Sequence, residues 1–243
     1  IDGSWAANEV LVGDPDQGRG YIRLIDFPGR ILPVGRNGGQ AWDTGGIFDF
    51  NIRSLISLDD AQLTMTCHGF VGHAPVVHWQ FGLLGVKEAV LRDADGVCIA
   101  MMERLAPPLT GYEAVKGPVS YVFNSTQIVA DFDAARAFYV NVLGWTAAQE
   151  TTMEHESGDN CMGLPLSVAR ECEVKIGVYH PRGVMEGSVE IIQFGVEGRD
   201  YSQAPAASRG IASLRFPVSD PAAILARAAE AGFAVMAVRE THI

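Results

Sequence analysis

The feature that most constrains this chain is a segment that occurs more than once. FDFNIRSLISLDDAQLTMTCHGFVG, residues 48–72, aligns without gaps on the stretch that ends in VADFDAARAFYVNVLGW, residues 129–145, so that Asn51 falls on Asn124. A third copy covers residues 211–233. Self-similarity of this kind indicates one supersecondary unit used repeatedly. The unit is too large for a solenoid repeat and predicts a small module.

The third copy shows how the unit is built. Apolar and other side chains alternate along residues 211–218, as in a strand with one buried face. Asp220 and Pro221 then supply a helix N-cap and a proline at the first helical position. We expect the helix to cover the apolar strand face, which leaves Ser213 and Arg215 on the opposite face of the sheet.

Further strands are expected after each helix, which gives a β-α-β-β-β module. They lie near residues 73–79, 86–93 and 97–103 in one copy and near 146–150, 171–180 and 188–196 in the next. We expect two module pairs: residues 1–105, with a partial module at 1–30 and a complete one at 45–105, and residues 118–243, with a complete module at 118–197 and a partial one at 210–243. We interpret the half-modules at the two ends as truncated; the alternative is that they complete each other.

Charge and cysteine content narrow the classes of partner. The chain has 243 residues, with 18 Lys and Arg against 29 Asp and Glu, a formal net charge of -11. Such a surface repels phosphate backbones and anionic lipid, so we expect neither nucleic acid nor membrane as a partner. Four cysteines without CxxC spacing predict reduced thiols in a cytoplasmic protein. A homodimer stays an open alternative.

The helix and turn motifs resemble those of one family. D-x-D-A-A-x-x-F-Y at 131–139 runs into L-G-W at 143–145, and R-D-A-D-G at 92–96 precedes a final strand. Together with the module order, they are similar to the vicinal oxygen chelate superfamily, which includes glyoxalase I, bleomycin-resistance proteins and extradiol dioxygenases. The resemblance implies an α+β fold in which paired β-α-β-β-β modules form curved mixed sheets that enclose a cleft.

The resemblance also implies a test for a metal. Metal-dependent members carry a His on the first strand, seven positions before the helix-opening aspartate, and a Glu on the last strand. The first-strand positions here are Asn51, Asn124 and Ser213, and the last-strand positions are Arg23, Ala100 and Glu190. Only Glu190 fits, and amide or hydroxyl oxygens are weak ligands for a transition metal. We therefore expect no metal and no cofactor; a site built from unexpected positions, such as His155 over Glu190, is the alternative.

A cleft lined by polar groups remains. In the second pair we expect the concave face to carry Asn124, Thr126, Glu190, Ser213 and Arg215. In the first pair we expect Asp49, Asn51, Arg53 and Arg23, and an Arg23–Asp49 ion pair is the structural alternative there. A glutamate on an apolar sheet face has a raised pKa, which makes Glu190 the candidate general base.

Three functions are consistent with these residues. The first is a metal-dependent enzyme of the dioxygenase or glyoxalase type, which the missing ligands oppose. The second is a metal-free binder of a small organic molecule, which the polar cleft with few histidines favours. The third is a metal-free enzyme with Glu190 as its acid–base group. We predict a protein that binds, and in the third case transforms, a small organic molecule in a metal-free cleft; fold alone does not decide among the three.

Overall fold

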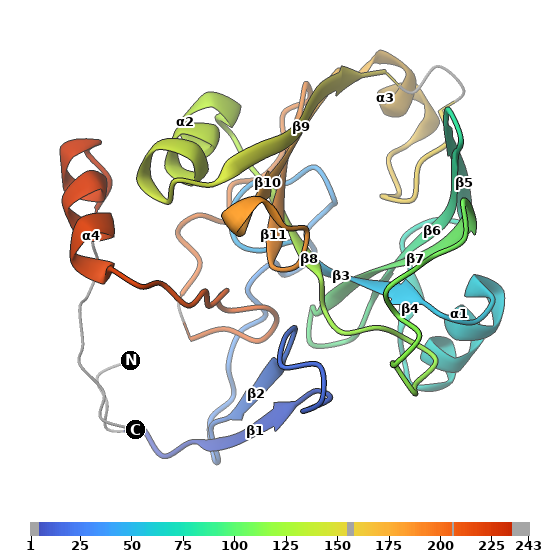
Figure 1. Cartoon of the computed structure of the whole chain (residues 1–243), viewed down its shortest axis with the longest axis horizontal. Helices are drawn as coiled ribbons and strands as arrows, with labels where there is room; N and C mark the ends of the chain where they lie inside the picture. Colours follow the sequence, from blue (N-terminus) through green and yellow to red (C-terminus); the bar gives the residue numbers. More distant parts are fainter. Residues whose placement is uncertain (1–4, 155–157, 206, 235–243) are drawn as a thin grey trace.

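A nine-stranded mixed sheet organises the molecule (Figure 1). The computed structural model describes residues 5–154, 158–205 and 207–234. The strands follow the order β4-β6-β7-β3-β8-β11-β10-β9, and β5 adds to β6. Their bounds are β3 Asp49–Ser54, β4 Val71–Gly72, β5 Val77–Phe81, β6 Leu84–Arg92, β7 Cys98–Ala106, β8 Asn124–Ile128, β9 Thr146–Met153, β10 Val174–His180 and β11 Ser188–Phe194. The expected α+β class with a curved mixed sheet is confirmed.

Helices cover the outer face of this sheet. α1 (Leu58–Cys67) buries Leu58 against β6 and β7, and α2 (Phe132–Ala137) continues into a π-helical turn, Phe138–Val142, that packs on β10 and β11. The predicted cap is present, because the Asp131 carboxylate accepts the Ala134 amide at 2.9 Å. A short helix, α3 (Leu166–Glu171), lies at the other side of the molecule, near β5 (Figure 1).

The sheet joins the two complete modules to each other. β3 pairs with β7 in parallel and with β8 antiparallel, and β8 pairs with β11 in parallel. We call the β3–β8 junction the seam. The sequence analysis instead paired each complete module with a neighbouring partial one. Both edges of β3 and both edges of β8 are occupied within this sheet, so a partial module does not pair at either strand. The division of the chain into the two predicted pairs stays a prediction.

The segment 211–218 is not a strand, contrary to the prediction. Leu214 and Phe216 pack on the outer face of the second module, where the Phe216 ring meets Trp145 edge-on at 4.9 Å. The helix that follows, α4 (Pro221–Glu230), is as predicted, with Asp220 as its N-cap. Its Arg227 Nε donates to the Val142 carbonyl at 2.7 Å. Leu214 and Phe216 are therefore buried by packing on the outer surface of the second module, and the segment does not pair with a strand of the sheet.

A separate hairpin forms from β1 (Asn8–Val12) and β2 (Ile22–Asp26), which lies apart from the main sheet in Figure 1. Arg23 is on this hairpin and pairs with Glu9. The structural alternative, an Arg23–Asp49 ion pair, is not formed, because Arg23 pairs with Glu9 on a different sheet from Asp49.

Two linkers without helix or strand, residues 28–46 before β3 and residues 195–205 after β11, bind each other and support the seam from one side. Thr44 N donates to the Arg199 carbonyl and Tyr201 N to the Thr44 carbonyl, both at 2.8 Å. The buried Asp43 carboxylate accepts from Arg199 N at 2.7 Å. Segments that looked irregular by composition are therefore fixed by reciprocal backbone hydrogen bonds, as buried backbone groups require.

Two observations concern the expectations about cysteines and about a membrane. All four cysteines are unpaired, with Cys67 exposed and the other three buried. Within the described ranges, every helix is too short or too polar to serve as a membrane span.

Candidate functional site

The inner face of the sheet carries a buried polar cluster at the seam. Asp49 lies opposite Thr126 and Asn51 opposite Asn124, while Thr126 is in register with Glu190 on β11. Side chains alternate across a strand, so these residues share the face that α1 and α2 do not cover. Apolar residues on the same face form a core with residues from the segments 41–48 and 161–172. We call Asp49, Asn51, Asn124, Thr126, Ser188 and Glu190 the seam cluster.

Side-chain amides connect the centre of the seam cluster. Asn51 Nδ2 donates to Asn124 Oδ1 at 2.6 Å and lies 3.3 Å from the Thr126 hydroxyl. Asn124 Nδ2 donates in turn to Ser188 Oγ at 2.7 Å. Both asparagines are less than a tenth exposed. The chain of bonds satisfies these buried polar groups and ties β3, β8 and β11 together.

Three carboxyl groups flank this amide chain. Thr126 Oγ1 donates to Glu190 Oε2 at 3.2 Å, and Trp79 Nε1 donates to Glu88 Oε2 at 2.8 Å. Asp49 is buried, and among the described residues its Oδ1 has no hydrogen-bond partner. An unpartnered buried carboxylate oxygen is costly, and hydrogen bonds from Thr126 offset part of this cost for Asp49.

The carboxyl groups hold their protons more tightly than usual. Burial raises the pKa of Glu190 to about 8, with the negative charges of Glu88 and Asp49 adding to the effect and the Thr126 hydrogen bond opposing it. Burial, together with Glu88, raises the pKa of Asp49 to about 7. Burial also raises the pKa of Glu88. Desolvation and like charge act in the same direction on an acid, and both are present here.

The predicted site residues divide into two groups. Asn51, Asn124, Thr126 and Glu190 are brought together, along with Asp49 and, further along β3, Arg53. Ser213 and Arg215 do not join them: both are exposed, on a segment outside the sheet. Arg23 is held on the separate hairpin. The expected convergence of Ser213 with Asn124 and Glu190 is wrong, because the seam, not a third copy, completes the cluster. That these side chains contact a ligand stays a prediction.

Sequence reasoning missed Glu88, Trp79 and Ser188. Glu88 is in register with Met102 on the inner face of β7. The alternation in VKEAVLRD places Glu88 on the same face as Val86 and Val90, so an acid among inward apolar positions was the available signal. Ser188 opens the last strand and carried no comparable signal.

The family's metal positions do not fit a transition metal in this chain. The Asn51 and Asn124 amides are bonded to each other, Ala100 has no donor atom, and Glu190 is a single carboxylate. Across the described residues, no group of three His, Cys, Asp or Glu side chains is arranged to hold an ion. His73 is neutral, because burial lowers its pKa to about 4. His155 lies outside the described residues.

A surface hollow opens elsewhere. Its volume is about 560 Å³, and residues 73–78 and 158–166 line it. None of the seam-cluster side chains lines this hollow. The seam cluster is thus a buried polar site, not the floor of this surface pocket.

Comparisons with known proteins agree with the topology. The profile of the Glyoxalase/Bleomycin resistance protein/Dioxygenase superfamily matches residues 121–243. No curated protein is significantly similar in sequence. Glyoxalase I from Zea mays is similar in structure, with a TM-score of 0.50 and 14% identity, over 78% of this chain and 55% of the maize protein. This chain therefore spans little more than half the length of that enzyme, and at this identity the likeness concerns the fold.

Two other solved structures are more distant. Methylmalonyl-CoA epimerase from Mycobacterium tuberculosis has a TM-score of 0.39 and 19% identity, over 61% of this chain and 87% of the epimerase. A mutant of 4-hydroxymandelate synthase from Streptomyces coelicolor has a TM-score of 0.42 and 13% identity, over 75% and 55% of the two chains. The profile match covers half of the sequence and the fold agrees with it: the chain belongs to the Glyoxalase/Bleomycin resistance protein/Dioxygenase superfamily.

Proposed function

We propose that this protein binds a small organic molecule against the seam cluster and that Glu190 exchanges a proton with it, without a metal. The observation that carries the proposal is the Glu190 carboxyl, held by Thr126 on the inner face of the sheet, with a pKa of about 8. Acid–base catalysis is most effective when the pKa of the group lies near the working pH.

The protonation state of Glu190 allows proton transfer both to and from a bound molecule. Near neutral pH most Glu190 carboxyls carry the proton and a minority are ionised, so the same group donates to or accepts from a bound molecule. The hydroxyl of Thr126 orients Oε2 and stabilises the ionised form. Glu88 and Asp49 oppose ionisation and thereby keep the Glu190 carboxylate strongly basic.

The amides of Asn51 and Asn124 serve the bound molecule as polar contacts. Each is buried and each still has hydrogen-bonding capacity on its oxygen, because a carbonyl oxygen accepts two bonds. A carbonyl or hydroxyl on the ligand fits such a lining better than an apolar group does. Apolar side chains around the cluster exclude water, which strengthens these polar interactions.

The test begins with ligand identification. Thermal unfolding is measured in the presence of small dicarbonyl and aromatic metabolites, since a ligand at a hundred times its dissociation constant adds about 2.7 kcal/mol to stability. Exchange of deuterium from D₂O into a stabilising compound is then followed by NMR.

We expect Glu190→Gln to keep the stabilisation and to lose exchange by at least about a hundredfold. Glu230→Gln, on the exposed end of α4, is the matched control and keeps both. Full exchange in Glu190→Gln would remove Glu190 from the chemistry, and absence of any stabilising compound from this chemical class would overturn the proposal as a whole.

A further inference from the structure

The inner face contains a second polar feature, the Arg53 guanidinium, which is buried without an ion-pair partner among the described residues. Arg53 is 5% exposed, and its Nε has no hydrogen-bond partner among the described residues. Its Nη1 and Nη2 lie 3.6 Å from the sulfurs of Met102 and Met185, and the Tyr112 hydroxyl also forms a hydrogen bond with the guanidinium. Thioether sulfur is a weak acceptor, so part of the hydrogen-bonding capacity of this cation is unused.

No nearby carboxylate neutralises this charge. Within the described ranges, none forms an ion pair with Arg53. Glu186, next to Met185, is used by Arg19 at 3.5 Å and by the Tyr121 hydroxyl at 3.3 Å. Glu88 attracts Arg53 but accepts its hydrogen bond from Trp79. Tyr112 stabilises the Arg53 charge, and the ring of Phe123 lies 4.1 Å from the guanidinium carbon.

A second arginine adds to the positive charge. Arg104 lies two residues beyond Met102 on the same face of β7, and its buried Nε also lacks a partner among the described residues. Arg104 opposes the protonated form of Arg53, and burial lowers the Arg53 pKa as well. Two unneutralised arginines together are unfavourable unless an anion joins them. The two arginines form a local positive site in a chain whose net charge is -11.

We propose, building on the proposed function, that Arg53 and Arg104 bind an oxyanion of the small molecule, a carboxylate or a phosphate, and so place its other end toward the seam cluster. The guanidinium fork matches such anions through paired hydrogen bonds. Arg53 follows Asn51 by two positions on the same strand face, which is a spacing of about 7 Å. A small anionic metabolite therefore reaches from Arg53 to the amides of the seam.

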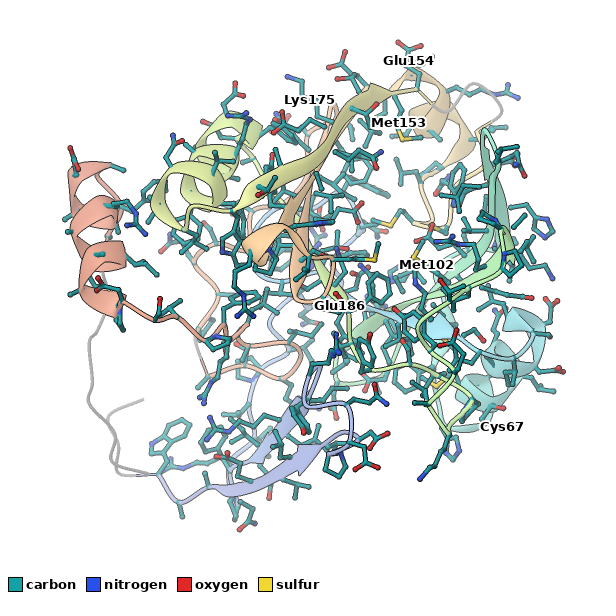
Figure 2. All side chains as sticks on the ribbon, viewed as in Figure 1. Cys67, Met102, Met153, Glu154, Lys175 and Glu186 are labelled. Carbon is teal, nitrogen blue, oxygen red and sulfur yellow. The ribbon has the colours of Figure 1, made fainter. Side chains whose placement is uncertain are left out.

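Met185 is the more exposed of the two methionines that contact Arg53. Met185 is 42% exposed and lies in the loop before β11, whereas Met102 is on β7. Figure 2 labels Met102 and the neighbour of Met185, Glu186, near the centre of the view, where the two modules meet. Methionine is unbranched and adapts its conformation readily, so an anion can displace the Met185 sulfur without moving the backbone.

The experiment uses the full chain and three salts at equal ionic strength: sodium chloride, sodium benzoate and sodium phosphate. Thermal unfolding and titration calorimetry are compared for wild type, Arg53→Met, Arg104→Met and the exposed control Arg170→Met. We expect benzoate or phosphate, but not chloride, to stabilise wild type and Arg170→Met. Affinity falls by about ten- to a hundredfold in Arg53→Met and Arg104→Met, as for a lost hydrogen bond to a charged group. The stronger of the two stabilising anions identifies the source as carboxylate or phosphate.

A purely structural role for Arg53 predicts a different result. In that case Arg53→Met destabilises the protein with and without anion, and the anion response persists. We expect instead that Arg53→Met without anion unfolds at the same temperature as wild type or higher, because a buried unpaired charge has been removed. An anion response equal in all four proteins, or absent from all, would overturn the inference.

Failure of this inference is distinguishable from failure of the proposed function. Glu190→Gln keeps the anion response, because Glu190 is not part of the anion site. If Glu190→Gln loses deuterium exchange but Arg53→Met keeps its stabilisation by anions, only the proposed anion site is wrong. If Arg53→Met loses the stabilisation by anions while Glu190→Gln exchanges deuterium at the full rate, only the proposed catalytic role of Glu190 is wrong.

Discussion

Asn51 and Asn124 are equivalent positions in the sequence alignment, and their side chains bond directly to each other across the seam, Nδ2 to Oδ1, at 2.6 Å. Antiparallel pairing of β3 with β8 places them opposite one another. Contact between aligned positions in an antiparallel register is also the pattern of an isologous interface. β3, β8 and β11 all contribute to the polar cluster.

The first prediction concerns this amide pair. Asn124→Ala removes the partner of both Asn51 and Ser188, and we expect it to lower the free energy of unfolding by about 1–3 kcal/mol. Asn51→Ala has a similar effect. In the double variant, the loss in free energy of unfolding is smaller than the sum of the two single losses by about 0.5 kcal/mol or more, because Asn51 and Asn124 share one hydrogen bond. Urea unfolding of the four proteins measures this coupling, with the exposed Asn8→Ala as control. Strict additivity would mean that the amides act independently.

The second prediction is a loss of stability with rising pH. Glu190 and Asp49 have folded-state pKa values of about 8 and about 7, above their ordinary values of 4.5 and 3.8. The folded protein therefore binds more protons than the unfolded chain between these limits. The stabilising contribution is complete at low pH and disappears as pH rises through 7 and 8, by up to about 1.4 kcal/mol per pH unit for one group.

Glu190→Gln should flatten that dependence. We expect thermal unfolding temperatures measured from pH 5 to pH 8 to fall more gently in this variant, and the variant to be more stable than wild type at pH 8. Glu230→Gln, whose carboxyl is on the surface, serves as the comparison. Parallel curves for all three proteins would show that Glu190 titrates normally.

The third prediction concerns Gly45, in the linker that supports the seam. Gly45 has φ of 84°, and a Cβ there would lie 2.7 Å from the Tyr201 carbonyl carbon and closer still to Ser202 N. We expect Gly45→Ala to destabilise the protein by more than about 3 kcal/mol, because the obstacle is backbone. Gly46 has φ of 71° but no such obstacle, so Gly46→Ala should cost only about 1 kcal/mol. Chemical unfolding of both variants tests the difference; equal costs would exclude the steric explanation.

The fourth prediction tests how the segment 211–234 is held. Phe216→Ala removes the edge-on contact with Trp145, and we expect faster proteolytic cleavage between residues 211 and 220, with a red shift of tryptophan fluorescence. The exposed Val218→Ala is the control and should behave as wild type. Resistance of Phe216→Ala to protease would mean that α4, through Arg227, is sufficient to hold the segment.

Local structure was predictable from the sequence where a residue type or pattern favours one local conformation, as for helix N-caps and alternating strands. Asp131 and Asp220 cap helices as expected, and alternation identified β10 and β11 closely. Alternation failed for 211–218 because it reports that one side of an extended segment is buried, not that its backbone pairs with a strand. Leu214 and Phe216 satisfy the same pattern on an outer surface.

The composition of the candidate site was predictable only in part. Asn51, Asn124, Thr126 and Glu190 were expected on concave faces, but in two different pairs. Which strand edges meet depends on long-range competition, and the edges of β3 and β8 carry no local signal for their partner. Glu88 and Arg104 became relevant only when the fold turned β6 and β7 toward the same interior.

Apart from the two-residue pairing of β4 with β6, the seam is the shortest strand pairing in the sheet. Of β3, only Asp49, Phe50 and Asn51 pair with β8, whereas its pairing with β7 continues to Ser54. If the two modules swing apart, the hinge will be these three residues, and the motion will hydrate Asp49 and Glu190 before any apolar core is disturbed. Proton release from the interior and opening of the molecule would then be one event.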